Sequence, residues 1–553
     1  MLTQKNFYRR DAETPRFVRD SSRQRSWTRV GILLSISLRL GVSAVIAISI
    51  GCGSKATDPR TVIPADALVY LESKNLRETL RPITENAKFA AAAKSKPNLN
   101  ALDGVRVSIA VTGFQTSEEA VTEENAVLNF QPRLVAVVET NAWGWQARSF
   151  IEDQLGEFVN EVYDGEVEMQ AIPRDDGKFY TWKAKDGRKA YALQQGSLIF
   201  FGNDESAIER CLAVKRGEAE SIAKNSKVTD DEGRLAFGYV SPEGVGQIAN
   251  IAGAFLAKNT SEEEEVQSFV ARVLPEILRN SLKELTWTMA MNKDGIEDKA
   301  VITLDDESSR VFGETIVPGQ AGGVQLTDLV PASAASASRY VIKDPQIAWR
   351  SLVLTAQKKT DQMSGSLIGA FSDSFFEPYG IENPEVFLSS VGSQLVTVKM
   401  GPDADDAAVI ASITDPAKIR ISLAKELNFS KPPEKLSGAD VWKSEDGEVA
   451  AAFLDNRVIV GDADTVLKCL EASGGNSNLG QAFASSDSVA TTAGSETDPA
   501  ARIVELFSER KNENEPIVNQ YRTETRFNKN GVERRTISDF GLLGSLLEHL
   551  ASE

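Results

Sequence analysis

Two short stretches, Trp182-Lys-Ala-Lys-Asp-Gly187 and Trp442-Lys-Ser-Glu-Asp-Gly447, decide the fold because they are two versions of one pattern. Each is followed by two short runs that are rich in β-forming residues. In the second of these runs, residues 197–202 (SLIFFG) match residues 457–461 (RVIVG). A pattern that recurs far along a chain indicates that one structural unit is encoded twice.

Further matches follow in the same order on both sides of these stretches. They pair Ile208-Glu-Arg-Cys211-Leu212 with Val466-Leu-Lys-Cys469-Leu470, Asn292-Lys-Asp-Gly295 with Asn528-Lys-Asn-Gly531, and Ile63-Pro64-Ala65 with Val330-Pro331-Ala332. The second of these pairs places an Asp-Gly or Asn-Gly turn between alternating strands, which is a strong hairpin signal. The shared order of all these matches predicts a tandem duplication.

Helix starts and turns predict the fold of each copy. Asp344-Pro345, Asp415-Pro416 and Asp498-Pro499 each combine a capping residue with proline at the first helical position, where the missing N–H costs nothing. Tight turns join neighbouring strands, so we expect a mostly antiparallel sheet with helices packed on one face. The predicted class is α+β, with one module at residues 56–318 and its second copy at 319–553. The first copy also has a long helix at about residues 261–285.

The amino-terminal part has the features of an export signal. Residues 1–29 form a basic arm, and residues 30–51 form an apolar signal or anchor segment. Ser49-Ile50-Gly51-Cys52 resembles the end of bacterial lipoprotein signals, and this resemblance implies that Cys52 is lipidated. The alternative is an uncleaved transmembrane anchor over the same apolar segment. Both interpretations keep the basic arm in the cytoplasm, so we expect an exported, membrane-anchored protein that faces the periplasm.

The opening of the first copy, Pro64-Ala65-Asp66-Ala67-Leu68-Val69-Tyr70, and the repeated strand and helix blocks resemble a family of uncharacterised bacterial envelope proteins. That family is classed as a domain of unknown function. The resemblance implies an envelope location and duplicated α+β modules, and it implies no activity.

The charge of the chain limits its partners. The formal net charge is -18, although the amino-terminal arm is basic. An acidic body repels phosphate backbones, so we expect no binding to nucleic acid. The expected partners are the membrane, through the amino-terminal lipid or anchor, and an envelope protein.

Few residues of this chain could carry catalysis. The single histidine is His549, close to the carboxyl terminus, so histidine-dependent catalysis and multi-histidine metal sites are not expected. Cys211 and Cys469 are interpreted as buried apolar residues, with a disulfide between them as the alternative. Ser221-Ile-Ala-Lys224 has the spacing of a Ser-Lys pair but lacks recognisable companions. We therefore predict no catalytic residue, no metal and no cofactor, and the protein is not expected to be an enzyme.

Other conspicuous residues are assigned structural roles. Trp143, Trp145 and Trp349 are expected in core or inter-module packing, with stacking on a ligand as the alternative. The acidic runs at residues 230–232 and 403–406 are expected to be solvated turns.

Three functions follow in order of preference. The first is a non-catalytic, membrane-tethered binding or scaffold protein of the bacterial cell envelope. The second is a carrier or sensor of an apolar small molecule or lipid, which requires an apolar cavity of about 300 Å³ or more. The third is a hydrolase that uses Ser221 with Lys224, or two carboxylates in one cleft.

Overall fold

The structure is a computed structural model that describes residues 56–545, apart from 121–125, 164, 166, 175–176, 230–232, 261–263, 321–324, 402–405, 473–482, 484–487 and 513–514. The predicted signal segment, the predicted lipidation site at Cys52 and His549 lie outside the described residues, so these assignments stay predictions.

The strands divide between two halves of the chain. The first half contains β1 (Val69–Ser73), β2 (Arg106–Ala120), β3 (Ala126–Glu139), β4 (Val167–Arg174), β5 (Gly177–Ala184), β6 (Lys189–Gln195), β7 (Leu198–Gly202), β8 (Arg234–Val240), β9 (Leu282–Asn292) and β10 (Gly295–Leu304). The second half contains β11 (Ser336–Val341), β12 (Val391–Lys399), β13 (Ala407–Ile413), β14 (Glu434–Leu436), β15 (Ala439–Lys443), β16 (Val449–Leu454), β17 (Arg457–Asp462), β18 (Ala490–Glu496), β19 (Asn519–Asn528) and β20 (Gly531–Ser538).

The helices lie between these strands. Those of the first half are α2 (Leu76–Thr84), α3 (Ala87–Ala92), α4 (Gly144–Ser149), α5 (Gly156–Val162), α6 (Glu205–Lys215), α7 (Pro242–Thr260), α8 (Glu264–Ser281) and α9 (Asp306–Thr315). Those of the second half are α10 (Pro345–Lys358), α11 (Gln362–Phe371), the 3-10 helix η7 (Ser372–Tyr379), α12 (Pro384–Ser390), α13 (Pro416–Ser422), α14 (Ala463–Glu471) and α16 (Asp498–Phe507).

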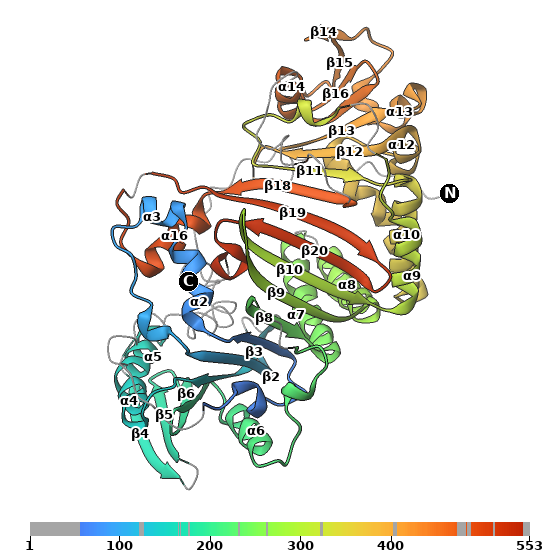
Figure 1. Ribbon diagram of the computed structural model, residues 1–553. Coiled ribbons are helices and arrows are strands. Elements are labelled where there is room, and N and C mark those ends of the chain that lie inside the picture. The colour runs from blue at the N-terminus through green and yellow to red at the C-terminus, as the bar shows by residue number, and fades with distance from the viewer. Residues whose placement is uncertain are drawn as a thin grey trace.

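The described strands form one continuous antiparallel sheet along the molecule (Figure 1). From one edge its order is β4-β5-β6-β7-β3-β2-β1-β8-β9-β10, followed by β20-β19-β18-β11-β12-β13-β17-β16-β15-β14. The second half thus has the strand order of the first, read from the opposite edge. The predicted α+β class with a mostly antiparallel sheet is confirmed. The duplication and its boundaries at residues 56–318 and 319–553 stay predictions.

The two halves meet where β10 pairs with β20. Lys299 and Arg535, which hold the same place in the two matched hairpins, lie directly opposite each other. Lys299 forms an ion pair with Glu533 at 3.0 Å, and Arg535 forms one with Glu297 at 2.5 Å. The contact is therefore nearly twofold symmetric, as in an isologous interface between two identical subunits.

Helices cover both faces of the outer strands, although the sequence predicted helices on one face. In β7, Phe200 packs in a core beneath α6 with Ile208. The next residue, Phe201, packs in a second core beneath α4 and α5 with Leu155. Successive side chains of a strand point to opposite faces, and SLIFFG is apolar at consecutive positions. A strand of this kind needs cover on both sides, which explains the difference.

Local helix signals were mostly read correctly. Asp344 and Asp415 cap α10 and α13 through their side chains, as predicted. The cap predicted at Asp498 is wrong by one residue, because α16 already begins at Asp498 and Thr497 is its N-cap residue. The helix expected at 261–285 is wrong at its end, because α8 stops at Ser281 and β9 begins at Leu282. The last residues of the expected helix pair instead with β8 and β10.

A buried carboxylate holds the chain that follows β20. Asp298 of β10 accepts hydrogen bonds from Trp287 Nε1 at 2.9 Å and from the backbone N–H of Leu542 at 2.7 Å. Its side chain is buried, and this burial raises its pKa to about 6 because the charged form loses water. Folding therefore favours the protonated form of Asp298.

We expect this carboxylate to make stability depend on pH. The pKa is higher in the folded than in the unfolded chain, so the contribution of Asp298 falls as pH rises from about 4 to about 6, by roughly 3 kcal/mol in total. Asp298→Asn removes this titration. In urea unfolding from pH 4.5 to 7.5, the free energy of unfolding of the wild type should fall relative to that of the variant as pH rises. Parallel curves for the two proteins would contradict this.

Candidate functional site

Helices cross between the two halves at both ends of the central strands. The helix after β18, α16, lies against α3 of the first half, where the rings of Phe89 and Phe507 are 6.3 Å apart. The helix pair after β8 ends in α8, which lies against α11 of the second half, where Phe269 and Phe371 are 5.5 Å apart. Figure 1 shows α3 and α16 at one end of these strands and α8 and α10 at the other. The two crossings occupy corresponding places in the strand order.

The crossing at α3 and α16 is filled with side chains. Its core is made of fully or nearly fully buried residues from both halves, including Leu80, Ile83, Phe89, Ile503, Val504 and Phe540. Lys94 and Glu509 close its exposed side with an ion pair at 2.8 Å. This crossing is an ordinary hydrophobic core.

The crossing at α8 and α10 instead borders a partly open cavity of about 930 Å³. Side chains of α8, α10, α11, η7 and α12 line it, together with residues of β11, β12 and β13; they include Val273, Ile277, Ala348, Trp349, Phe376 and Leu395. Its polar lining side chains, among the described residues, are Tyr340, Ser372, Ser374, Tyr379 and Thr397, and no charged side chain lines it. The volume lies in the range that is typical of small-ligand sites, and the lining is mostly apolar.

Longer helices frame the hollow crossing. The helices α7 and α8, of 19 and 18 residues, follow β8 where the second half has α16, of 10 residues, after β18, and α10 has 14 residues, whereas α2 has 9. Each added residue extends a helix by about 1.5 Å. Asn280 Nδ2 of α8 donates to the carbonyl oxygen of Lys359 at 2.7 Å and joins the far ends of the two helices. The longer helices thus span a wider space than the side chains fill.

The three tryptophans have different environments. Trp349 lines the cavity, with Phe376 at 5.0 Å and Phe375 at 6.3 Å between ring centroids. Trp143 and Trp145 are 48% and 67% exposed, so the core packing predicted for them is wrong. Their place at the start of α4 leaves the rings on the outer surface, which local sequence does not reveal.

Sequence reasoning missed the cavity wall formed by α11 and η7. A signal was present, because residues 362–376 (QMSGSLIGAFSDSFF) contain a single charged residue, Asp373. Such a stretch is equally typical of a buried helix, so only the position of α8 shows that it borders a cavity.

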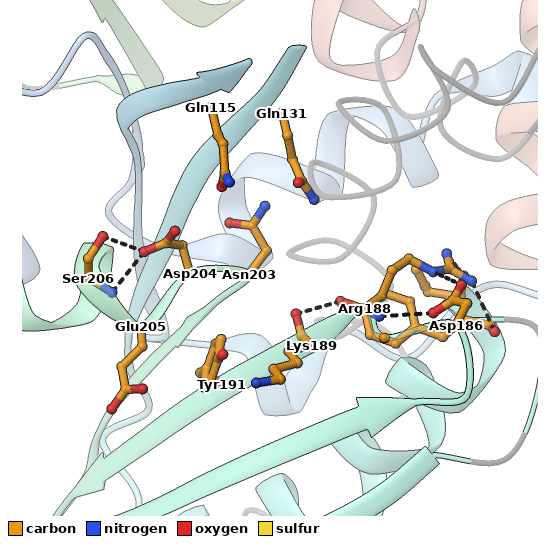
Figure 2. Close-up of a pocket in the computed structure, with 13 residues that line it drawn as sticks. Gln115, Gln131, Asp186, Arg188, Lys189, Tyr191, Asn203, Asp204, Glu205 and Ser206 are labelled. Atoms are coloured by element: carbon orange, nitrogen blue, oxygen red, sulfur yellow. Dashed lines mark hydrogen bonds and ion pairs between the residues drawn. The ribbon is translucent and has the colours of Figure 1, made fainter. Parts of the chain in front are cut away.

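A second, polar pocket of about 610 Å³ lies in the first half, between the β2–β3 hairpin and α6 (Figure 2). Most of its charged groups already serve the local fold. Arg188 forms an ion pair with Asp186 and lies 4.6 Å from the ring centroid of Tyr163. Asp204 caps α6 by accepting from Ser206 N at 2.8 Å. This pocket offers a ligand fewer free groups than its polar lining suggests.

The predicted Ser-Lys pair does not form. Ser221 Oγ donates to the carbonyl oxygen of Arg60 at 3.2 Å and accepts from Ala223 N at 3.1 Å. Lys224 Nζ pairs instead with Glu220 at 3.3 Å and is well exposed. The serine is the cap of a short 3-10 helix at residues 222–224, so this route to a hydrolase is not supported.

Neither a metal-binding cluster nor a membrane-spanning helix is found in the part of the chain that the structure describes. No group of three His, Cys, Asp or Glu side chains is placed to hold a metal there. None of the helices in the same residues has the length and apolar character needed to cross a bilayer. The acidic run at 230–232 lies outside the described residues, as does all of 403–406 except Asp406.

The comparisons with known proteins do not assign this chain to a family. No protein-family model matches the chain, and no curated protein matches its sequence. Two crystal forms of TP0453, a Treponema protein, are similar to parts of the structure at TM-scores of 0.22 and 0.20, with 8% and 10% identity. The alignments cover 47% and 48% of this chain and 86% and 90% of the other. The resemblance to an envelope family therefore stays a prediction.

The cysteines occupy equivalent but separate cores, as free buried thiols. Cys211 lies in the core beneath α6, and Cys469 lies in the core beneath α14. The alternative of a disulfide between them is thus wrong. Burial raises the pKa of each thiol to about 12, because the thiolate would lose its water.

We expect both thiols to resist alkylation in the folded protein at pH 8 and to react after unfolding without reductant. Iodoacetamide labelling followed by peptide mass spectrometry measures this. Labelling of Cys211 or Cys469 in the folded chain would contradict the packing described here.

Proposed function

We propose that this protein binds an apolar small molecule or a lipid acyl chain in the cavity between α8 and α10. The observation that carries the proposal is the cavity itself. Its volume of about 930 Å³ lies within the range of roughly 300–1,000 Å³ that is typical of small-ligand sites. The sequence alone favours a scaffold, whereas the cavity favours a carrier or sensor of an apolar ligand.

The contrast between the two crossings supports a binding role. The same strand order and the same helix crossing produce a filled core at α3 and α16, so the fold does not itself require a hole. Each buried methylene that a ligand places in the hollow crossing would contribute about 0.8 kcal/mol. An unfilled apolar space instead costs stability, because its lining atoms lack partners.

The lining also indicates which part of a ligand the cavity accepts. No charged group lines it among the described residues, so a carboxylate or phosphate would be buried there without a counterion. An acyl chain would therefore enter tail first and leave its polar head at the opening. The role proposed is a non-catalytic carrier or sensor, in the exported, membrane-anchored location that residues 30–51 and Cys52 predict.

A cavity-filling variant tests this function. Ala356 of α10 lines the cavity, and Ala356→Trp should place an indole ring where the ligand would lie. Ala417 of α13 is exposed and does not line the cavity, so Ala417→Trp is the matched control. The full chain in phosphatidylcholine vesicles is exposed to a photoactivatable fatty acid, and labelled residues are mapped by peptide mass spectrometry.

We expect label on α8 and α10 residues that line the cavity in the wild type and in Ala417→Trp, and loss of that label in Ala356→Trp. A wild type without label on these helices, or an Ala356→Trp variant labelled as strongly as the control, would refute the proposed function.

A further inference from the structure

Exposed apolar side chains lie on α11 and η7, two of the elements that line the cavity. Met363 and Leu367 of α11, Phe371 at its end and Phe375 of η7 are 62%, 37%, 44% and 72% exposed, respectively. We call these four residues the apolar rim. Large apolar side chains that gather on a surface, rather than standing singly, mark an interaction site.

The rim is continuous with the cavity. Phe371 and Phe375 both line the cavity and both reach solvent. Phe371 contacts Phe269 of α8, and Phe375 contacts Trp349 of α10. The apolar surface therefore passes from the outside of the protein into the cavity at Phe371 and Phe375, and Asp373 is the one charged residue between them in sequence.

The low number of charged residues in and around the rim indicates which kind of partner it binds. Residues 362–376 contain one charged residue, whereas charged residues make up 25% of the whole chain. A protein partner steered by electrostatic complementarity would need charges around this patch. The net charge of -18 also disfavours adsorption to anionic headgroups. A stretch with one charged residue and exposed phenylalanine rings instead suits the interface of a zwitterionic lipid bilayer, where aromatic side chains are favoured.

We propose that the apolar rim docks on the surface of a lipid bilayer, so that an acyl chain passes from the bilayer into the cavity. This inference rests on the proposed function, and it names the source of the ligand. The apolar segment at residues 30–51, which predicts a membrane attachment of the same chain, would keep the rim close to that surface.

Site-specific photo-crosslinking in the full chain tests the docking. Benzoylphenylalanine replaces Phe371 or Phe375 in protein reconstituted in phosphatidylcholine vesicles. The matched control is the same replacement at Trp145, which is an aromatic residue of similar exposure, 67%, on α4 of the other half. Illumination is followed by mass spectrometry of the crosslinked peptides.

We expect phosphatidylcholine adducts at positions 371 and 375 and none at 145. Equal lipid adducts at all three positions, adducts to protein alone, or no adducts would overturn the docking. A second variant, Met363→Ser, changes a rim residue that is exposed and does not line the cavity, so it should reduce fatty-acid labelling of the cavity in vesicles while leaving the melting temperature unchanged. Unchanged labelling in this variant would count against the rim as the route of entry.

The two proposals fail in different ways. If the cavity is labelled by the fatty acid while positions 371 and 375 give no lipid adducts, the docking is wrong and the binding function stands. If the rim gives lipid adducts while Ala356→Trp and the wild type label alike, the protein docks on lipid but the cavity is not its binding site.

Discussion

The antiparallel pairing of β10 with β20 determines how the two halves of the chain meet. It turns two sheets into one and sets Lys299 opposite Arg535, with reciprocal ion pairs to Glu533 and Glu297. Because this pairing is nearly twofold symmetric, it brings the helices that follow β8 and β18 onto the opposite half of the chain. Both the filled core at α16 and the cavity at α8 therefore follow from one strand pairing.

The same strand pairing would have been hard to foresee. The Asn-Gly and Asp-Gly turns and the Asp-Pro caps could be read from sequence, because each signal acts within a few residues. The hairpins at Gly295 and Gly531 are found where they were predicted. No local signal predicts that β10 and β20 pair with each other, because the exposed edge of any strand offers the same backbone groups.

The cavity lay beyond sequence reasoning for a related reason. Val273 of α8 and Trp349 of α10 are distant in sequence, and only the crossing of helices between halves places both on one wall. An apolar helix face looks alike whether a side chain or a ligand covers it. The exposed rings of Trp143 and Trp145 were misjudged similarly, because large aromatic residues are more often buried than displayed.

Carrying both crossings in a single chain has an evolutionary consequence. In a homodimer of a half-length protein, each substitution would appear at both crossings, so lengthening one helix to open a space would open two. Here separate parts of one gene encode α8 and α16, so the two helices can change independently. The crossing at α3 and α16 can thus keep its packed side chains and stabilise the fold. The crossing at α8 and α10 can lose packing and acquire a ligand.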